Sequence, residues 1–115
     1  MSKNPNASND GALSHLRVVE LGDIPASYAT RLLADLGADV IKVEPPGGDP
    51  NRLLPPFAGN IEHPERSLTF INANTNKRSI VLDLEKSAGD REVFAKLLGS
   101  AQLFVEATPL SYLEE

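Results

Sequence analysis

The residues best suited to bind an anionic ligand form one polar run, residues 72–79, which reads NANTNKRS. Asparagines at three alternate positions precede two cations, Lys77 and Arg78, and an apolar run typical of a strand follows them. Lys and Arg side chains at such a place could hold a phosphate or a nucleotide. The alternative is an ordinary turn with solvated charges, and the run by itself leaves both interpretations open.

The sequence offers few groups for nucleophilic or metal chemistry. It contains no cysteine and only two histidines, His15 and His63. A thiol nucleophile, a disulfide framework and a Cys-ligated metal are therefore excluded. Neither histidine has a serine and an acid at a spacing that would indicate a catalytic triad. We expect no catalytic residue and no metal site in this chain.

The motifs of the common nucleotide-binding loops are also missing. The first expected turn holds one glycine, Gly22, where the dinucleotide motif G-x-G-x-x-G requires three, and no G-x-x-x-x-G-K-[ST] occurs. Glu44 lies 22 positions after Gly22, where an NAD-binding acid would hold the ribose. An NAD(P)-binding domain therefore remains an alternative, supported by Glu44 and by the expected fold.

The elements that would position these residues alternate between strands and helices. Apolar, β-branched runs predict strands over residues 16–21, 39–44, 79–84 and 102–106. A helix is expected over residues 26–36, and a second one follows the capping residue Ser87 and ends at Gly99. Two β-α-β units of this kind predict a Rossmann-like parallel sheet, an α/β fold.

Both helices show an apolar stripe at helical spacing. Steps of three and four residues place these side chains on one face of each helix. In the first helix the stripe is Tyr28, Ala29, Leu32, Leu33 and Leu36, and in the second it is Val93, Phe94, Leu97, Leu98 and Ala101.

Between the two units, residues 45–78 contain six of the nine prolines, which exclude long regular elements. We expect a loop over the edge of a binding crevice, with a short helix between Leu68 and Asn74. Two helices cannot cover both faces of four parallel strands. Residues 13–115 are therefore expected to be part of a larger domain, or a protomer whose core a partner completes. The alternative is a small complete domain with one thinly covered face. Residues 1–12 are expected to be a disordered lead-in, and a further helix is expected to start at residues 111–115.

Charge and hydropathy narrow the function classes further. The 115 residues carry a net charge of −5, which gives no overall attraction for a nucleic-acid backbone. No apolar run reaches the ~18 residues of a membrane span. The composition predicts a cytoplasmic domain with neither a nucleic-acid nor a membrane partner.

Two sequence blocks, taken together, are specific enough to indicate a protein family. The first, residues 31–50, reads RLLADLGADVIKVEPPGGDP, and the second, residues 76–84, reads NKRSIVLDL. In content, order and spacing they resemble the class III CoA-transferases, the family of formyl-CoA transferase, the carnitine CoA-transferases and alpha-methylacyl-CoA racemase. The resemblance implies an N-terminal Rossmann-like domain that binds CoA or an acyl-CoA as substrate, without a covalently bound cofactor, and homodimers in full-length members.

The resemblance also implies which residues contact CoA. The turn at 24–26 resembles the family segment that lies against CoA, and positions 82 and 85 fall where the family contacts the adenosine end. Glu85 stands where the family often has a basic residue, and Ala107 and Thr108 replace an asparagine and an aromatic residue. With the two cations, the expected CoA-binding residues are Ile24, Pro25, Ala26, Lys77, Arg78, Leu82, Glu85, Ala107 and Thr108.

In the family, the nucleophile is an aspartate well beyond the fourth strand, in a region that this sequence does not contain. We therefore expect no transferase turnover from the chain alone. The interpretation is the CoA-binding N-terminal part of an enzyme that moves CoA between carboxylic acids. The alternatives are part of an acyl-CoA racemase of the same family, a non-catalytic interaction module, and the NAD(P)-binding domain.

Overall fold

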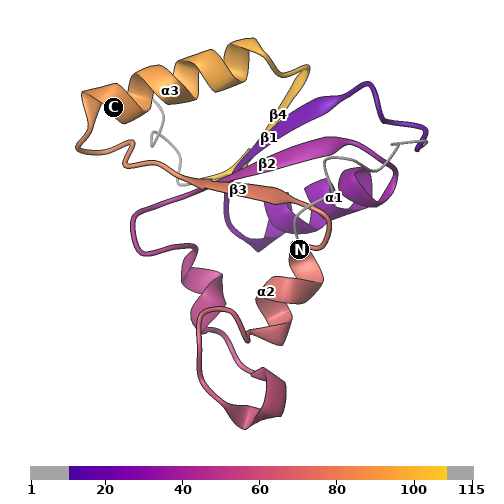
Figure 1. The fold of residues 1–115 in the computed structure, drawn as a ribbon, viewed down its shortest axis with the longest axis vertical. Coiled ribbons are helices and arrows are strands. Elements are labelled where there is room, and N and C mark those ends of the chain that lie inside the picture. The colour runs from indigo at the N-terminus through magenta and orange to yellow at the C-terminus, as the bar shows by residue number, and fades with distance from the viewer. Residues whose placement is uncertain (1–10, 109–115) are drawn as a thin grey trace.

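The computed structural model describes residues 11–108, and a four-stranded parallel sheet forms its centre (Figure 1). The strands are β1 (Arg17–Gly22), β2 (Asp39–Glu44), β3 (Arg78–Val81) and β4 (Leu103–Ala107), in the spatial order β3-β2-β1-β4. The expected α/β fold with parallel β-α-β units is confirmed.

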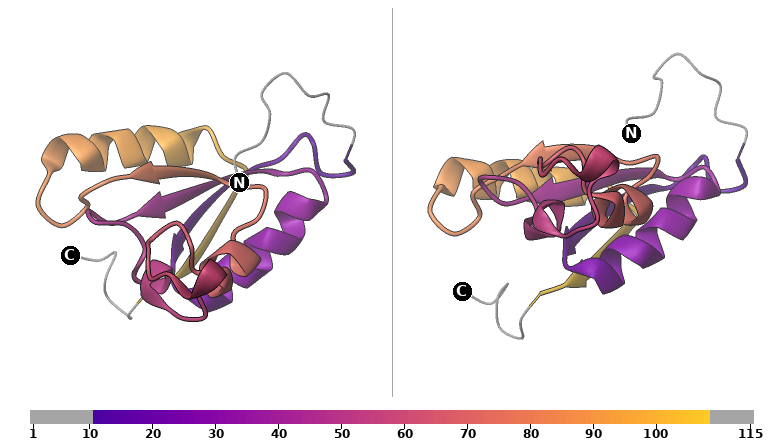
Figure 2. Two further views of the ribbon diagram at one scale, coloured as in Figure 1. Left: turned by 60° about the horizontal axis from the view of Figure 1, so that its bottom comes forward. Right: turned by 90° about the horizontal axis from the view of Figure 1, so that it is seen from below.

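Helices α1 (Ile24–Asp35) and α3 (Ala88–Gly99) cover opposite faces of this sheet (Figure 2). Successive residues of a strand point to opposite faces, so Val18 packs with Ala34 of α1, whereas Val19 lies in the cluster that includes Phe94 of α3. The core is thus two thin apolar layers, one on each face of the sheet.

The long connection between β2 and β3 contains short helical turns. These are η1 (Pro50–Leu53), η2 (Ala58–Asn60) and α2 (Leu68–Ala73). Ser67 begins α2, because its side chain accepts a hydrogen bond from the backbone N–H of Phe70. The short helix expected between Leu68 and Asn74 is confirmed.

Two boundaries differ from the expected ones by more than one residue. Helix α1 begins at Ile24 rather than at residue 26, because the Asp23 carboxylate caps it. Strand β3 ends at Val81, although the apolar run continues to Leu84, because its partner β2 ends at Glu44 and a turn begins at Leu84. The cap at Ser87 is confirmed, since its hydroxyl accepts from the Asp90 N–H.

Most of the apolar stripe of α1 does not face the sheet, and of its five members Leu33 alone packs against the Val18 cluster. Tyr28, Leu32 and Leu36 are 54%, 48% and 54% exposed, whereas Ser27 and Thr30 are buried. The helix is turned this way because its hydroxyl groups bind a carboxylate inside the sheet layer, described below. In α3 the stripe does pack on the sheet, apart from the exposed Val93.

Two expectations concern residues that lie wholly or mostly outside the described part of the chain. The disordered lead-in, residues 1–12, lies almost wholly before residue 11, and the further helix at 111–115 lies after residue 108.

Candidate functional site

A crevice of about 620 Å³ opens at the carboxyl ends of the strands. Ligands of open parallel sheets bind in this position. Four of the residues expected to contact CoA line it: Leu82, Glu85, Ala107 and Thr108. The start of the proline-rich loop forms another wall, through Pro45, Pro46, Asp49, Pro50 and Asn51. The first part of the expected loop therefore lies at the edge of a crevice, whereas residues 52–78 do not line it.

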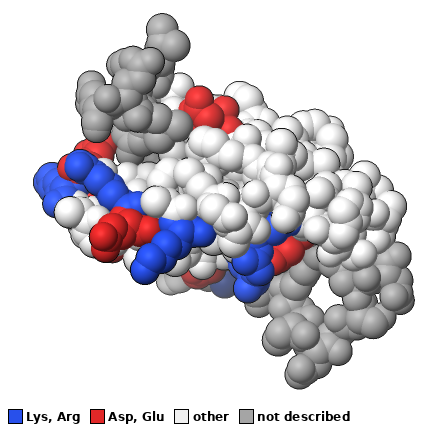
Figure 3. Space-filling view, turned by 90° about the horizontal axis from the view of Figure 1, so that it is seen from above, with Lys and Arg blue, Asp and Glu red and all other residues white. Residues whose placement is uncertain are grey.

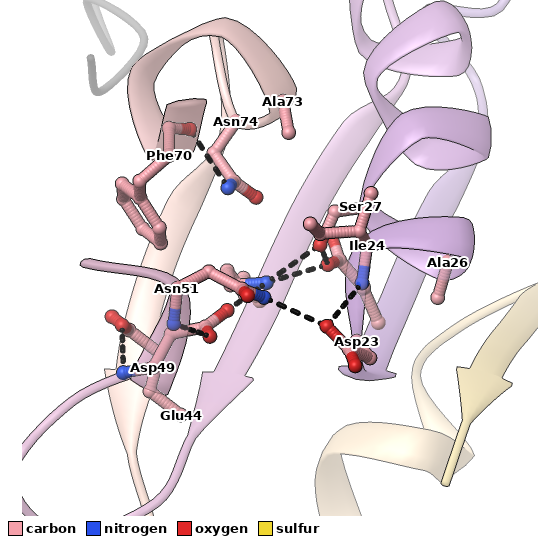
Figure 4. Close-up of polar contacts among 12 residues, drawn as sticks. Asp23, Ile24, Ala26, Ser27, Glu44, Asp49, Asn51, Phe70, Ala73 and Asn74 are labelled. Atoms are coloured by element: carbon pink, nitrogen blue, oxygen red, sulfur yellow. Dashed lines mark hydrogen bonds and ion pairs between the residues drawn. The ribbon is translucent and has the colours of Figure 1, made fainter. Parts of the chain in front are cut away.

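The turn before α1 reaches the crevice through Asp23, and residues 24–26 are not among those that line it. The Asp23 carboxylate accepts from the Ile24 N–H at 2.7 Å and from the Asn51 side-chain amide at 2.9 Å (Figure 4). These hydrogen bonds, the one from Asn51 first, lower the pKa of Asp23. The N-terminus of α1 thus already holds an anion, and Asn51 fastens the loop to it.

Behind the crevice wall lies a buried group of four charges. Glu20 and Lys42 sit opposite each other on β1 and β2, and Lys42 Nζ is 2.7 Å from one oxygen of Glu20. Lys77 Nζ is 2.6 Å from the other oxygen, and Asp49 lies 2.8 Å from Lys42. All four side chains are at most 5% exposed. Two cations and two carboxylates leave this buried cluster without net charge.

Hydroxyl groups of α1 complete the cluster. Ser27 and Thr30 donate to the two oxygens of Glu20 at 2.6 and 2.7 Å. A buried carboxylate needs such partners, since leaving its oxygens unsatisfied costs several kcal/mol. This requirement explains why α1 turns its polar side toward the sheet.

The pKa values in the cluster follow from burial and from its opposite charges. Burial alone would raise the pKa of Glu20, but Lys42 and Lys77 outweigh it and lower that pKa. Burial would lower the pKa of Lys42, but Glu20 and Asp49 raise it. For Lys77, burial dominates and lowers the pKa to about 8, although Glu20 opposes it.

A second ion pair anchors the proline-rich loop at the end of β2. Arg52 donates to both oxygens of Glu44, at 2.8 and 3.0 Å, and its guanidinium stacks on the Phe70 ring with 3.9 Å to the centroid. Burial raises the pKa of Glu44, but hydrogen bonds from Arg52, Ser79 and the Asp49 N–H lower it to about 2. Glu44 is thus held as a structural carboxylate and is not available to bind a ribose.

Lys77 and Arg78 lie away from the crevice. Besides Glu20, Lys77 Nζ contacts the carbonyl oxygens of Ser27 and Ala73 and the Asn74 side chain, at 2.8–3.0 Å. Arg78 begins β3 and forms a bidentate ion pair with Asp39 at the start of β2. This pair lies at the amino-terminal ends of the strands, whereas the crevice lies at their carboxyl ends. Both cations therefore have structural roles, and neither lines the crevice.

The loop between β3 and α3 is held in one conformation. Asp83 accepts from the Lys86 N–H and its own N–H donates to Asp90, while Arg91 donates to the carbonyl oxygens of residues 84 and 85 at 2.6 Å each. This bracing presents the Glu85 and Lys86 side chains, both exposed, at the crevice.

Sequence reasoning missed the contributions of Asp49, Asn51 and the Glu20–Lys42 pair. One signal was available, namely charged residues in the middle of two apolar strands that had to be buried on both faces. Among residues 11–108, no group of His, Asp and Glu side chains is arranged to hold a metal ion. The helices of this part of the chain are too short or too polar to cross a membrane.

Comparisons with known proteins agree on one family. The chain is 46% identical over 97 residues to succinyl-CoA:mesaconate CoA-transferase from Haloarcula hispanica, which covers 84% of this chain and 24% of that protein. It is 42% identical over 101 residues to the succinyl-CoA:(R)-benzylsuccinate CoA-transferase subunit BbsE from Thauera aromatica, covering 88% and 24%. The chain thus spans about a quarter of the length of these relatives.

A solved structure shares the fold as well. A CAIB/BAIF family protein from Brucella suis matches 90% of this chain and 28% of its own length, with a TM-score of 0.79 and 34% identity. The profile of CoA-transferase family III matches residues 13–115. On these grounds, the chain belongs to CoA-transferase family III.

Proposed function

We propose that this chain is the CoA-binding N-terminal part of an enzyme that moves CoA between carboxylic acids. One observation carries the proposal: in a chain of this family, a crevice at the carboxyl ends of the strands is lined by Leu82, Glu85, Ala107 and Thr108. The relatives described above are named as transferases of succinyl-CoA, which favours transfer over racemisation.

The geometry argues against the NAD(P) alternative. An acid that holds a ribose must be free to accept hydrogen bonds from its hydroxyl groups. Glu44 already accepts from Arg52 and from the Asp49 N–H. With a single glycine in the first turn, little remains to support dinucleotide binding.

Calorimetric titration with CoA, acetyl-CoA and NADH tests the ligand. We expect binding of CoA or its thioester, and weaker or no binding of NADH. Tighter binding of NADH than of either thioester would refute the proposal.

A partner surface belongs to the same proposal. The exposed apolar stripe on α1, formed by Ile24, Tyr28, Leu32 and Leu36, runs along the outside of the helix. Exposed apolar patches of this kind mark protein interfaces, and we propose a second copy of the chain as the occupant. Light scattering should then show a dimer, and a monomer at all concentrations would contradict the proposal.

We propose from charge and composition that the chain has no nucleic-acid partner and lies in the cytoplasm. The face viewed from the α3 side carries Lys or Arg and Asp or Glu groups interspersed, without a continuous basic area (Figure 3). Such a face offers no track for a nucleic-acid backbone. The chain has no cysteine and needs no oxidising compartment to form disulfides, which supports the proposed cytoplasmic location.

A further inference from the structure

The segment between β3 and α3 forms one wall of the crevice without belonging to either element. Residues 82–86 line the crevice, and the last three of them form a turn. Leu82 is buried and its N–H donates to the Glu44 carbonyl oxygen at 3.0 Å, which fixes the start of the segment to β2. The side chains of Glu85 and Lys86 are exposed and make no hydrogen bond or ion pair with the described residues. Contacts to the backbone must therefore set the shape of the turn.

Two side chains of α3 provide these contacts. The Arg91 guanidinium donates through Nε to the Leu84 carbonyl oxygen and through Nη2 to the Glu85 carbonyl oxygen, at 2.6 Å each. The Asp90 carboxylate accepts from the Asp83 N–H at 2.8 Å. Neither Arg91 nor Asp90 lines the crevice. Two residues behind the wall thus hold backbone groups of three consecutive residues in it.

The side chain of Arg91 contacts this turn rather than an acidic neighbour. It forms no ion pair with residues 11–108, although Asp90 and Glu92 are next to it in the chain. A planar guanidinium suits the task, because its N–H groups form a fixed fork that reaches two acceptors at once. Since Arg91 is exposed, its removal opens no cavity in the core. Loss of this side chain should therefore loosen the turn far more than the fold.

We propose that Arg91 is a positioning residue of the crevice, which holds the turn between β3 and α3 in the shape that the ligand meets. The inference rests on the proposed binding of CoA, but not on which part of CoA lies at this wall. A turn that is ordered before binding loses less conformational entropy when the ligand binds. The wall formed by the proline-rich loop is held in a similar way, by hydrogen bonds of Asp49 and Asn51.

Calorimetric titration of Arg91→Met with CoA and acetyl-CoA tests the inference. The variant keeps an apolar side chain but removes both donors, and the affinity for either ligand should fall about tenfold, which is about 1.4 kcal/mol. Arg91→Lys keeps the charge but lacks the fixed fork that reaches two carbonyl oxygens, so it should also bind more weakly than the unmodified chain. An affinity of Arg91→Lys equal to that of the unmodified chain would show an effect of charge alone and would overturn the positioning role.

Lys96→Met is the matched control. Lys96 is exposed on the same helix and lies outside the crevice lining, so the same change of net charge should leave the affinity unchanged. An equal loss of affinity in this variant would contradict the inference.

Amide hydrogen exchange adds a measurement that needs no ligand. The N–H groups of Asp83 and Lys86 are bonded beside the turn, so their exchange should quicken in Arg91→Met but not in Lys96→Met, while the urea midpoints of the two variants stay close. Unchanged affinity of Arg91→Met, or lower affinity without faster exchange, would overturn the role of Arg91 while CoA binding stands. Failure of CoA and acetyl-CoA to bind any of the four proteins would overturn the proposed function itself.

Discussion

Replacing Lys77 by methionine tests whether this residue is structural. The variant keeps the length of the side chain but leaves one Glu20 oxygen without its ammonium partner, at a place where both residues are almost fully buried. It also removes the donor from the Asn74 side chain and from two carbonyl oxygens. Breaking a buried pair on one side costs about 3–5 kcal/mol. That loss is a large part of the 5–15 kcal/mol by which an ordinary domain is stable.

Arg78→Met is the control, because it removes the neighbouring cation. Arg78 pairs with Asp39 at the surface, with 47% of its side chain exposed, so its loss should cost at most about 1 kcal/mol. Urea unfolding followed by far-ultraviolet circular dichroism suits a chain without tryptophan. We expect the midpoint to fall by about 2 M for Lys77→Met, given a typical slope of 1–3 kcal/mol per M. Equal midpoints for the two variants would refute the reasoning.

Three further outcomes follow from the same contacts. The pKa of Glu44 is near 2 in the folded chain against 4.5 otherwise, so about 3 kcal/mol of stability should be present above pH 4.5 and lost as the pH falls toward 2. Unfolding of Glu44→Gln across that range should lack this dependence. Asp23→Ala removes the α1 cap and the Asn51 contact and should cost about 1–2 kcal/mol in the same urea assay. Leu32→Glu should abolish the dimer in light scattering without lowering the unfolding midpoint, because Leu32 is 48% exposed.

The sequence predicts the strands and helices and their alternation because local sequence patterns determine them. β-branched runs and short αβ connections identify the strands, and the bounds of β2 agree at both ends. The cap at Ser87 could be predicted because it depends on a hydrogen bond between residues three positions apart. The crevice also follows, since it depends only on which ends of the strands are aligned.

The orientation of α1 could not be predicted, because it depends on a residue outside the helix. An apolar stripe normally faces the core, but here the buried Glu20 requires donors, and Ser27 and Thr30 supply them. Ala34 and Ala26, small and buried, permit the close approach. Satisfying one carboxylate outweighs the burial of an aliphatic stripe that another protein surface can cover.

The role of Lys77 escaped sequence reasoning for the same reason. A cation in a polar run is typical of a solvated turn, and its partner Glu20 lies 57 positions earlier in the chain. Only the return of the chain after α2 brings the two together, with Asn74 at the helix end as a further acceptor. Because β3 begins directly after this segment, Arg78 lies at the amino-terminal ends of the strands, away from the crevice.

The buried cluster has a consequence for the crevice that reaches beyond stability. Asp49 belongs both to the cluster, through Lys42, and to the crevice wall. Its backbone N–H is held by Glu44, and its side chain accepts from the Asn51 N–H, while Asn51 in turn binds Asp23. The loop that forms one wall is therefore fixed by charges inside the sheet layer rather than by its own sequence of prolines and glycines. Because these contacts fix the wall before a ligand binds, the loop loses less conformational entropy on binding.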